Sequence, residues 1–146
     1  MRRLTLSRFI LIMFGVGLFF VYEFTAQKNE RQIKFNTSLL NALDEVIWVK
    51  DTNDILLFVS DKYCKYVFND PIKPIELIGI SAEKVFGKET NERFKRNDEY
   101  VLKYDTSVTF LEYSIVNNDT IYYYVQKTAL KNDKGVNFAT VGKGLD

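Results

Sequence analysis

The pattern of apolar and polar residues changes character along the chain. Residues 9–22 (FILIMFGVGLFFVY) form a run of fourteen uncharged and mostly apolar residues. Residues 26–45 then mix charges with apolar residues at steps of three and four, such as Ile33, Leu40 and Leu43, which predicts a helix with one partly apolar face. Beyond residue 45, short apolar runs alternate with turn-forming residues, and this predicts strands and short helices.

The region after residue 45 begins with a predicted hairpin. Residues 46–51 and 55–59 are apolar runs typical of strands, and the Thr, Asn and Asp of residues 52–54 favour a tight turn between them. Ser60 or Asp61 is a suitable N-cap for a short helix that follows.

A helical middle is predicted next. The two prolines and the Asn-Asp pair of residues 69–74 predict a loop that no helix crosses. A turn at Gly79, an N-cap at Ser81 and a stop at Gly87 predict a second short helix. Residues 90–104 lack a breaker and predict a longer amphipathic helix.

The last part of the chain predicts a three-strand meander. Residues 107–116, 121–128 and 136–145 are rich in β-branched and aromatic residues, and turn formers occupy 117–119 and 132–135. The whole order predicts an α+β fold, with one five-stranded antiparallel sheet and helices on one of its faces.

The length of 146 residues suits one domain with an appendage. We predict a transmembrane anchor at 1–25, a helical connector at 26–45 and a folded domain at 46–146. The apolar run is short of the roughly 20 residues that span a bilayer, but flanking residues extend it. Two alternatives stay open, a cleaved secretory signal and a buried core helix, although Phe24 is a poor residue before a cleavage site near Ala26.

Charge and residue usage exclude several classes of function. The net charge of +1 gives no reason to expect a nucleic-acid partner. The chain has no histidine, so the usual haem ligation is unavailable, and its single cysteine, Cys64, cannot form an internal disulfide. There is no nucleophile–base pair, phosphate-binding glycine loop or acidic metal cluster at ligand spacing, so we predict that the protein is not an enzyme and holds no metal. Asp98 is expected to cap the long helix or to form a salt bridge.

Five segments in sequence order resemble a bacterial PAS domain: IWVKDTNDILLFVS, ELIGISAEKVF, NDEYVL, YYYVQKTALKNDKG and VGKGLD. The resemblance covers residues 38–146 and implies the PAS fold, preceded here by a signalling helix. The matching motif positions are Lys50, Asp51, Ser60, Gly79, Lys127 and Asp146. The glycine that is common in the first turn of the family is absent, and Asn53 and Asp54 stand in its place.

The resemblance implies a sensory role, with a cavity between the sheet and the helices that in this family holds haem, flavin, a carboxylate or nothing. Haem and flavin are not expected, since histidine is absent and Cys64 lies in the first short helix, where a packed thiol is expected. No cofactor is predicted. The predicted cavity residues are Val49, Leu57, Phe86, Phe94, Tyr113 and Tyr124.

We therefore predict a membrane-anchored sensory module that binds a small ligand or a partner and relays a conformational change through its flanking helices. The expected setting is a homodimer in a bacterial inner membrane, as the input part of a kinase or cyclase sensor. The alternative is a non-sensing dimerisation module that localises a partner at the membrane. The arginines before the apolar run favour a domain outside the cytoplasm, whereas coupling to an effector favours the cytoplasm, and a continuation beyond Asp146 stays open.

Overall fold

The computed structural model describes residues 6–68, 72–116 and 119–145, with side chains from residue 17 onwards except at 116 and 119. The chain divides into two units, Met1–Leu39 and Leu40–Asp146. The second unit thus begins within the segment 26–45 that was predicted as a connector. It includes the last turn of the N-terminal helix.

The N-terminal helix α1 runs from Leu6 to Ala42, so the predicted connector continues from the apolar run as one helix. It ends just before Asp44, whose left-handed backbone (φ 51°) ends the helical conformation. Within the described residues, none of the helices is both long and apolar enough to cross a membrane. The side chains of residues 1–16, which include much of the predicted anchor, lie outside the described part.

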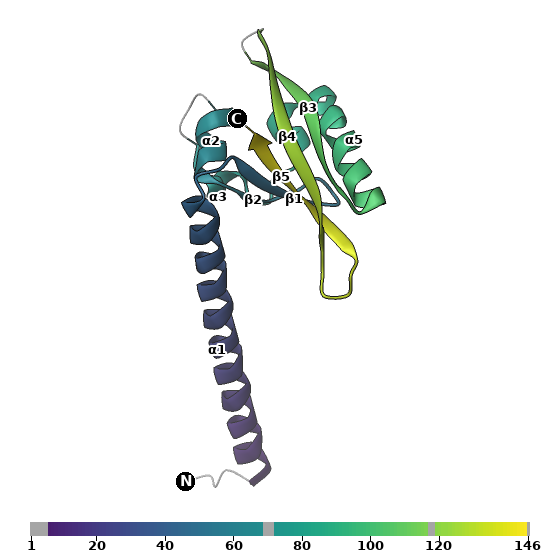
Figure 1. Cartoon of the computed structure of the whole chain (residues 1–146). Helices are drawn as coiled ribbons and strands as arrows, with labels where there is room; N and C mark the ends of the chain where they lie inside the picture. The colour runs from purple at the N-terminus through teal and green to yellow at the C-terminus, as the bar shows by residue number, and fades with distance from the viewer. Residues whose placement is uncertain (1–5, 69–71, 117–118, 146) are drawn as a thin grey trace. The chain divides into compact units, whose positions relative to one another are not determined.

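The second unit contains one sheet. Its strands are β1 (Ile47–Asp51), β2 (Leu56–Val59), β3 (Ser107–Val116), β4 (Asp119–Lys131) and β5 (Asn137–Leu145). They pair antiparallel in the order β2-β1-β5-β4-β3, so the last strand of the chain lies at the centre (Figure 1). The predicted five-stranded antiparallel sheet is confirmed.

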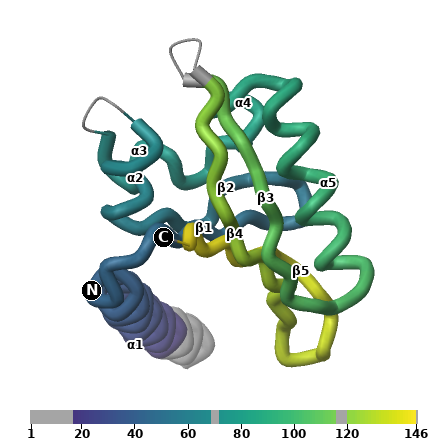
Figure 2. The backbone as a smooth tube through the Cα atoms, turned by 45° about the horizontal axis from the view of Figure 1, so that its top comes forward, coloured from purple at the N-terminus to yellow at the C-terminus, as the bar shows by residue number. Residues whose placement is uncertain are grey.

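Within the described residues, four helices connect β2 to β3. They are α2 (Asp61–Val67), α3 (Pro74–Leu77), α4 (Ala82–Phe86) and α5 (Lys88–Tyr104). Figure 2 shows α2 and α3 beside β1 and β2, and α5 along β3 and β4. These helices leave space between themselves and the sheet, and the side chains around that space form the candidate site.

Helix α3 was not predicted, and it begins at the last residue of the loop predicted for residues 69–74. Pro74 is its first residue, and this position tolerates proline because the missing N–H would have no helical partner there. Glu76 accepts a hydrogen bond from the Lys73 N–H at 2.9 Å, which closes the turn. Residues 69–71 of the predicted loop lie outside the described residues.

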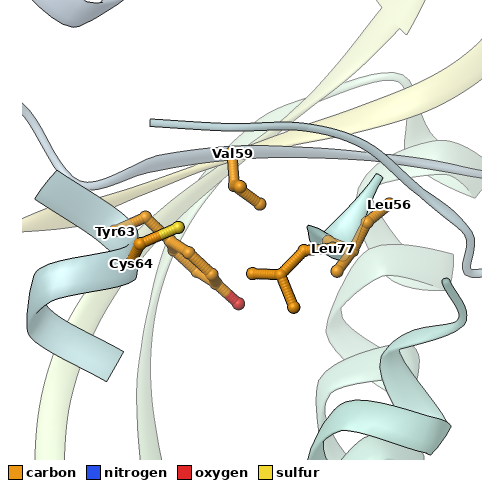
Figure 3. Close-up of a cluster of buried hydrophobic side chains, with 5 residues drawn as sticks. All are labelled: Leu56, Val59, Tyr63, Cys64 and Leu77. Carbon is orange, nitrogen blue, oxygen red and sulfur yellow. The ribbon is translucent and has the colours of Figure 1, made fainter. Parts of the chain in front are cut away.

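A small hydrophobic core joins β2 to α2 and α3. Its buried members are Leu56, Val59, Tyr63, Cys64 and Leu77. In Figure 3 the Tyr63 ring reaches from α2 towards Leu77, beside Val59 of the sheet. Cys64 is 3% exposed, and burial raises the pKa of its thiol, in agreement with the predicted packed thiol.

Candidate functional site: a cavity with a buried ion cluster

A cavity of about 670 Å³ lies between the sheet and helices α2, α4 and α5. A volume of this size is typical of sites for small molecules. Its wall combines aromatic rings with charged and hydroxyl side chains. The aromatic residues of the lining include Trp48, Tyr63, Phe68, Phe86, Phe94 and Tyr123.

Glycines in the central strand help to make this space. Gly142 of β5 pairs with Trp48 on one side and with Lys127 on the other. A Cβ atom at Gly142 would overlap the Trp48 indole, so the ring can lie over the strand only because glycine is there. Gly144, two residues further, also lines the cavity. The middle of the sheet thus contributes bare backbone where a side chain would fill the site.

The hairpin turn after β1 positions the first charges. Asp51 accepts hydrogen bonds from the N–H groups of Asn53 and Ile55, both at 2.9 Å, which closes the turn. Asp54 adopts a left-handed backbone (φ 68°), at the place where the family resemblance would have put a glycine. Unlike glycine, Asp54 also supplies a carboxylate, which is buried and lies 2.6 Å from the ammonium group of Lys50.

Lys50 is 2% exposed and faces the cavity from β1. Its ammonium group also lies 2.7 Å from a carboxylate oxygen of Asp98 on α5. Burial by itself lowers the pKa of Lys50, but the carboxylates of Asp98 and Asp54 outweigh it, so the pKa is raised above its usual value. Asn91 on α5 donates a hydrogen bond to the second carboxylate oxygen of Asp54.

Lys127 on β4 joins the same charges from the other side. Its ammonium group lies 2.9 Å from Asp98 and 2.8 Å from Glu112 of β3, and it donates a hydrogen bond to the Phe94 carbonyl at 3.0 Å. These three acceptors match the three N–H groups of an ammonium group. We call Lys50, Asp54, Asp98, Glu112 and Lys127 the buried ion cluster; it ties β1, β3 and β4 to α5.

Hydroxyl groups continue the polar wall of the cavity. Tyr123 shares a hydrogen bond of 2.6 Å with Ser114 on the neighbouring strand. Burial raises the pKa of Tyr123 to about 12. Burial also raises the pKa of Tyr63, and the nearby Tyr123 adds to this shift. Both phenols therefore stay protonated at neutral pH and can donate hydrogen bonds to a molecule in the cavity.

Ser60 connects Tyr63, which lines the cavity, to the segment between α1 and β1. Its hydroxyl caps α2 by accepting from the Tyr63 N–H at 3.1 Å, as the sequence predicted. The same oxygen accepts from the Ile47 N–H at 3.1 Å and donates to the Glu45 carbonyl at 2.7 Å. Asn41, in the last turn of α1, accepts a hydrogen bond from the Asp61 N–H at 3.1 Å. The residues between α1 and β1 are thus held by the first turn of α2.

The structure separates the predicted cavity residues into two groups. Phe86, Phe94 and Tyr124 contribute to the cavity lining, whereas Val49, Leu57 and Tyr113 lie outside it. Leu57 is 43% exposed, and the Tyr113 ring lies under the guanidinium group of Arg93 at 4.1 Å.

The predicted motif positions have definite structural roles. Asp51 closes the hairpin, Ser60 caps α2, and Gly79 has the left-handed backbone (φ 82°) expected of a turn. Lys50 and Lys127 do more than the motif indicates, since both belong to the buried ion cluster. Asp146 lies outside the described residues.

Three carboxylates of the cluster were not predicted as site residues. Asp98 was expected to cap or to form a salt bridge, and it forms two, with Lys50 and Lys127. No feature of the sequence marked Asp54 or Glu112 as a member of an ion pair. The lysine partner of Asp54 lies across the hairpin turn, and the lysine partner of Glu112 lies on a different strand. Within the described residues, no group of three side chains is arranged to hold a metal ion.

No protein-family model matches the sequence, and the curated proteins contain no match to it. Solved structures do resemble it. VqmA bound to DPO superposes with a TM-score of 0.63 at 19% identity, over 75% of this chain and 55% of that chain. The VqmA dimer of Vibrio cholerae gives a TM-score of 0.64 at 20% identity, over 75% of this chain and 48% of that chain. The chain thus spans about half the length of the VqmA chains that it matches.

Another similar structure is a single domain of matching size. The PAS domain of BvgS from Bordetella pertussis superposes with a TM-score of 0.61 at 16% identity, over 80% of this chain and 86% of that domain. At such identities the likeness concerns the fold alone. The strand order, the helices between β2 and β3 and these superpositions agree with one another: the second unit of the chain has a PAS fold.

Proposed function

We propose that the second unit is a sensory module that takes up a small molecule in the cavity and passes the change to α1. The observation that carries this proposal is the cavity of about 670 Å³, which is lined by aromatic rings and by Lys50, Glu112 and Lys127 of the buried ion cluster. Burying five ionisable groups beside a cavity is costly unless they serve a purpose, and charged groups in clefts are candidates for function. The sensory proteins among the similar structures support this role.

The route from the cavity to α1 is short. Tyr63 lines the cavity from the first turn of α2, and its N–H is held by the Ser60 hydroxyl. That hydroxyl also holds the Glu45 carbonyl, and Asp61 of the same turn is bonded to Asn41 at the end of α1. A ligand that moves Tyr63 therefore has to move α2 or break these contacts. Either change alters how α1 leaves the module, which is the kind of relay that helix shifts provide.

Binding can be tested with a variant that fills the cavity. Val85 on α4 lines the cavity, so Val85→Trp adds an indole to that space. Ile75→Trp is the matched control, because Ile75 is 75% exposed on α3. We expect a library of small aromatic compounds to raise the melting temperature of the wild type and of Ile75→Trp, and to leave Val85→Trp unchanged. If no compound binds, or if Val85→Trp binds equally well, the proposal is wrong.

We further propose that residues 1–25 attach the module to a membrane and that an effector completes the sensor. The apolar run 9–22 with its flanking arginines supports the attachment. Extraction of membranes from expressing cells at alkaline pH tests it: the full chain should stay in the pellet, and Val16→Lys should release it.

A second candidate function is dimerisation, either alone or as part of sensing. Large apolar side chains are exposed on the face of the sheet opposite Glu112 and Tyr123, including Leu111 and Tyr122, which are 57% and 64% exposed. We propose that this face meets a second copy of the chain. Light scattering of the purified protein tests the pairing, and Leu111→Lys should shift a dimer to a monomer, whereas Thr109→Lys, further along β3, should have a smaller effect.

A further inference from the structure

We infer that the cavity takes a flat aromatic molecule that carries a hydrogen-bond acceptor, such as a ketone oxygen or an unprotonated ring nitrogen. This inference rests on the proposed function, because it names the chemical class of the ligand for the same cavity. It follows from three features of the lining: charged groups that already have partners, hydroxyl groups with hydrogens to donate, and a set of aromatic rings.

The charged groups of the lining, Lys50, Glu112 and Lys127, are already paired within the protein. The ammonium group of Lys127 faces two carboxylates and donates to the Phe94 carbonyl, which occupies its three N–H groups. The ammonium group of Lys50 lies within 2.7 Å of two carboxylates. The Oε1 atom of Glu112 lies 2.8 Å from Lys127 and accepts a hydrogen bond from Asn97. The ligand is therefore recognised by groups that still have hydrogen-bonding capacity, and not by an unpaired charge.

Tyr63 offers the first spare hydrogen-bond donor. It is 4% exposed and lines the cavity from α2. In Figure 3 its hydroxyl oxygen lies at the end of the ring that points away from α2. The hydroxyl group forms no hydrogen bond with the described residues, yet it is not a fully enclosed atom, so a ligand can reach it. Because burial raises its pKa, the phenol keeps its proton at neutral pH and has that proton to donate.

Tyr123 and Ser114 offer the second spare donor. Their hydroxyl oxygens lie 2.6 Å apart and share one hydrogen between them. Two hydroxyl groups carry two hydrogens, so the other hydrogen is left for an acceptor on the ligand. Both residues line the cavity. The nearness of Tyr123 adds to the raised pKa of Tyr63, which shows that the two phenols serve the same part of the cavity.

A third donor comes from Lys50, which has one N–H left after its two carboxylates. An acceptor on the ligand is the group that all three donors can bind, because an ammonium group cannot accept a hydrogen bond. Against these donors stands the Oε2 atom of Glu112, since both described donors to this carboxylate meet Oε1. A donor that is removed from water without an acceptor is costly, so a ligand that brings an acceptor gains more from this wall than one that brings only a donor.

The aromatic lining suits a flat ring. The rings of Trp48 and Tyr63 lie 5.5 Å apart, and Phe86 and Phe94 form an edge-to-face pair at the same distance. All four residues line the cavity. Aromatic rings favour offset-stacked and edge-to-face contacts, and a flat aromatic ligand makes both. A flat ring with an acceptor at its edge therefore fits the aromatic wall and the donors together.

Three neutral probes of similar size and shape test this class: 1-indanone, indole and indane. Each has a benzene ring fused to a five-membered ring, and they differ in the polar group, which is a ketone acceptor, an N–H donor and none. Calorimetric titration of the full wild-type chain should give a dissociation constant for 1-indanone that is about tenfold lower than for indole or indane. If indole or indane binds as tightly as 1-indanone, the inference is wrong, and the proposed function stands because the cavity still binds.

Phenylalanine variants link the preference to the hydroxyl groups. Tyr63→Phe keeps the ring and removes the donor, so it should weaken binding of 1-indanone about tenfold and leave indane unchanged. Tyr123→Phe is a second variant with the same expected direction, and it carries the test if Tyr63→Phe does not fold. Tyr104→Phe is the matched control and should change neither, since Tyr104 is 57% exposed and lies outside the lining.

Unchanged binding of 1-indanone in the folded phenylalanine variants would overturn the assignment of the donors. If none of the three probes binds the wild type but another aromatic compound raises its melting temperature, the inference is wrong and the proposed function stands. If no compound binds at all, both fail.

Discussion

The ammonium group of Lys127 lies 2.9 Å from a carboxylate oxygen of Asp98, and both side chains are almost completely buried. This pair joins the sheet to α5 beside the cavity. A buried charge is tolerable only with its partners in place, so the stability of the fold depends on the buried ion cluster, of which Lys50, Glu112 and Lys127 line the proposed site.

Replacing Lys127 by methionine keeps most of its volume and removes its charge. The carboxylates of Asp98 and Glu112 then lose a counter-charge in a buried place, so we expect the free energy of unfolding to fall by about 3–5 kcal/mol. Urea denaturation measures the change. Lys131→Met is the control, since Lys131 pairs with Asp105 at the surface, and a surface pair contributes less than about 1 kcal/mol. Equal losses in the two variants would show that the buried cluster stabilises the fold no more than a surface ion pair does.

The Ser60 hydroxyl serves three backbone groups at once. Ser60→Ala removes the contacts with Tyr63, Ile47 and Glu45, and we expect a loss of about 1–3 kcal/mol. Ser81→Ala removes one cap contact, with Lys84, and should lose only about 0.5–1 kcal/mol. Urea midpoints compare the two variants directly. A larger effect at Ser81 would contradict the role given to Ser60, which is to hold the segment between α1 and β1 against α2.

The structure predicts a loss of stability at alkaline pH. The pKa values of Lys50 and Tyr123 are raised on folding, the latter from 10.0 to about 12. A raised pKa means that the folded state holds its proton more tightly than the unfolded chain. The resulting stabilisation is complete below about pH 10, the ordinary tyrosine value, and is lost as the pH rises through the folded-state pKa.

Urea midpoints measured between pH 8 and about pH 12 check this expectation. The midpoint should be constant at first and then fall. Tyr123→Phe should make the fall less steep, because it removes one of the titrating groups. Tyr104→Phe is the control, since Tyr104 is 57% exposed, and it should leave the curve unchanged. A flat alkaline curve for the wild type would contradict the upward shifts.

The contact between Gly142 and Trp48 gives a packing test. Gly142→Ala places a methyl group against the indole, which has to move into the cavity or away from it, at a cost of about 1–3 kcal/mol. Gly144→Ala meets Val46 at 3.1 Å and should cost less. Tryptophan fluorescence reports the displacement, because Trp48 is the single tryptophan of the chain. An unchanged spectrum and stability in Gly142→Ala would argue against this packing.

Local signals were enough to predict most of the fold. Ser60 as a cap, the left-handed turn around Asp54 and the strands of the meander follow from residue chemistry that acts over a few positions. Helix α3 was missed because Pro74 was read as a helix breaker, whereas proline is also a good first residue of a helix.

The cavity was harder to predict for two physical reasons. Alternation showed that Trp48 and Lys50 share a face, but aromatic residues occur on both faces of β3 and β4, so pattern alone did not show which face is inner. Val49 and Tyr113 were predicted as cavity residues and lie outside its lining for this reason. The ion cluster depends on tertiary contacts between a turn, a helix and two strands, and no sequence spacing encodes such contacts.

The central claim is that a molecule in the cavity changes the junction between α1 and the PAS module. Amide hydrogen exchange of the full chain tests it most directly, with and without a saturating compound that raises the melting temperature of the wild type but not of Val85→Trp. We predict slower exchange in α2 and in the segment 41–47, where Asn41, Glu45 and Ile47 are held by Asp61 and Ser60. Protection confined to β3, β4 and α5, with no change in α2 and 41–47 while the probe is bound, would contradict the account.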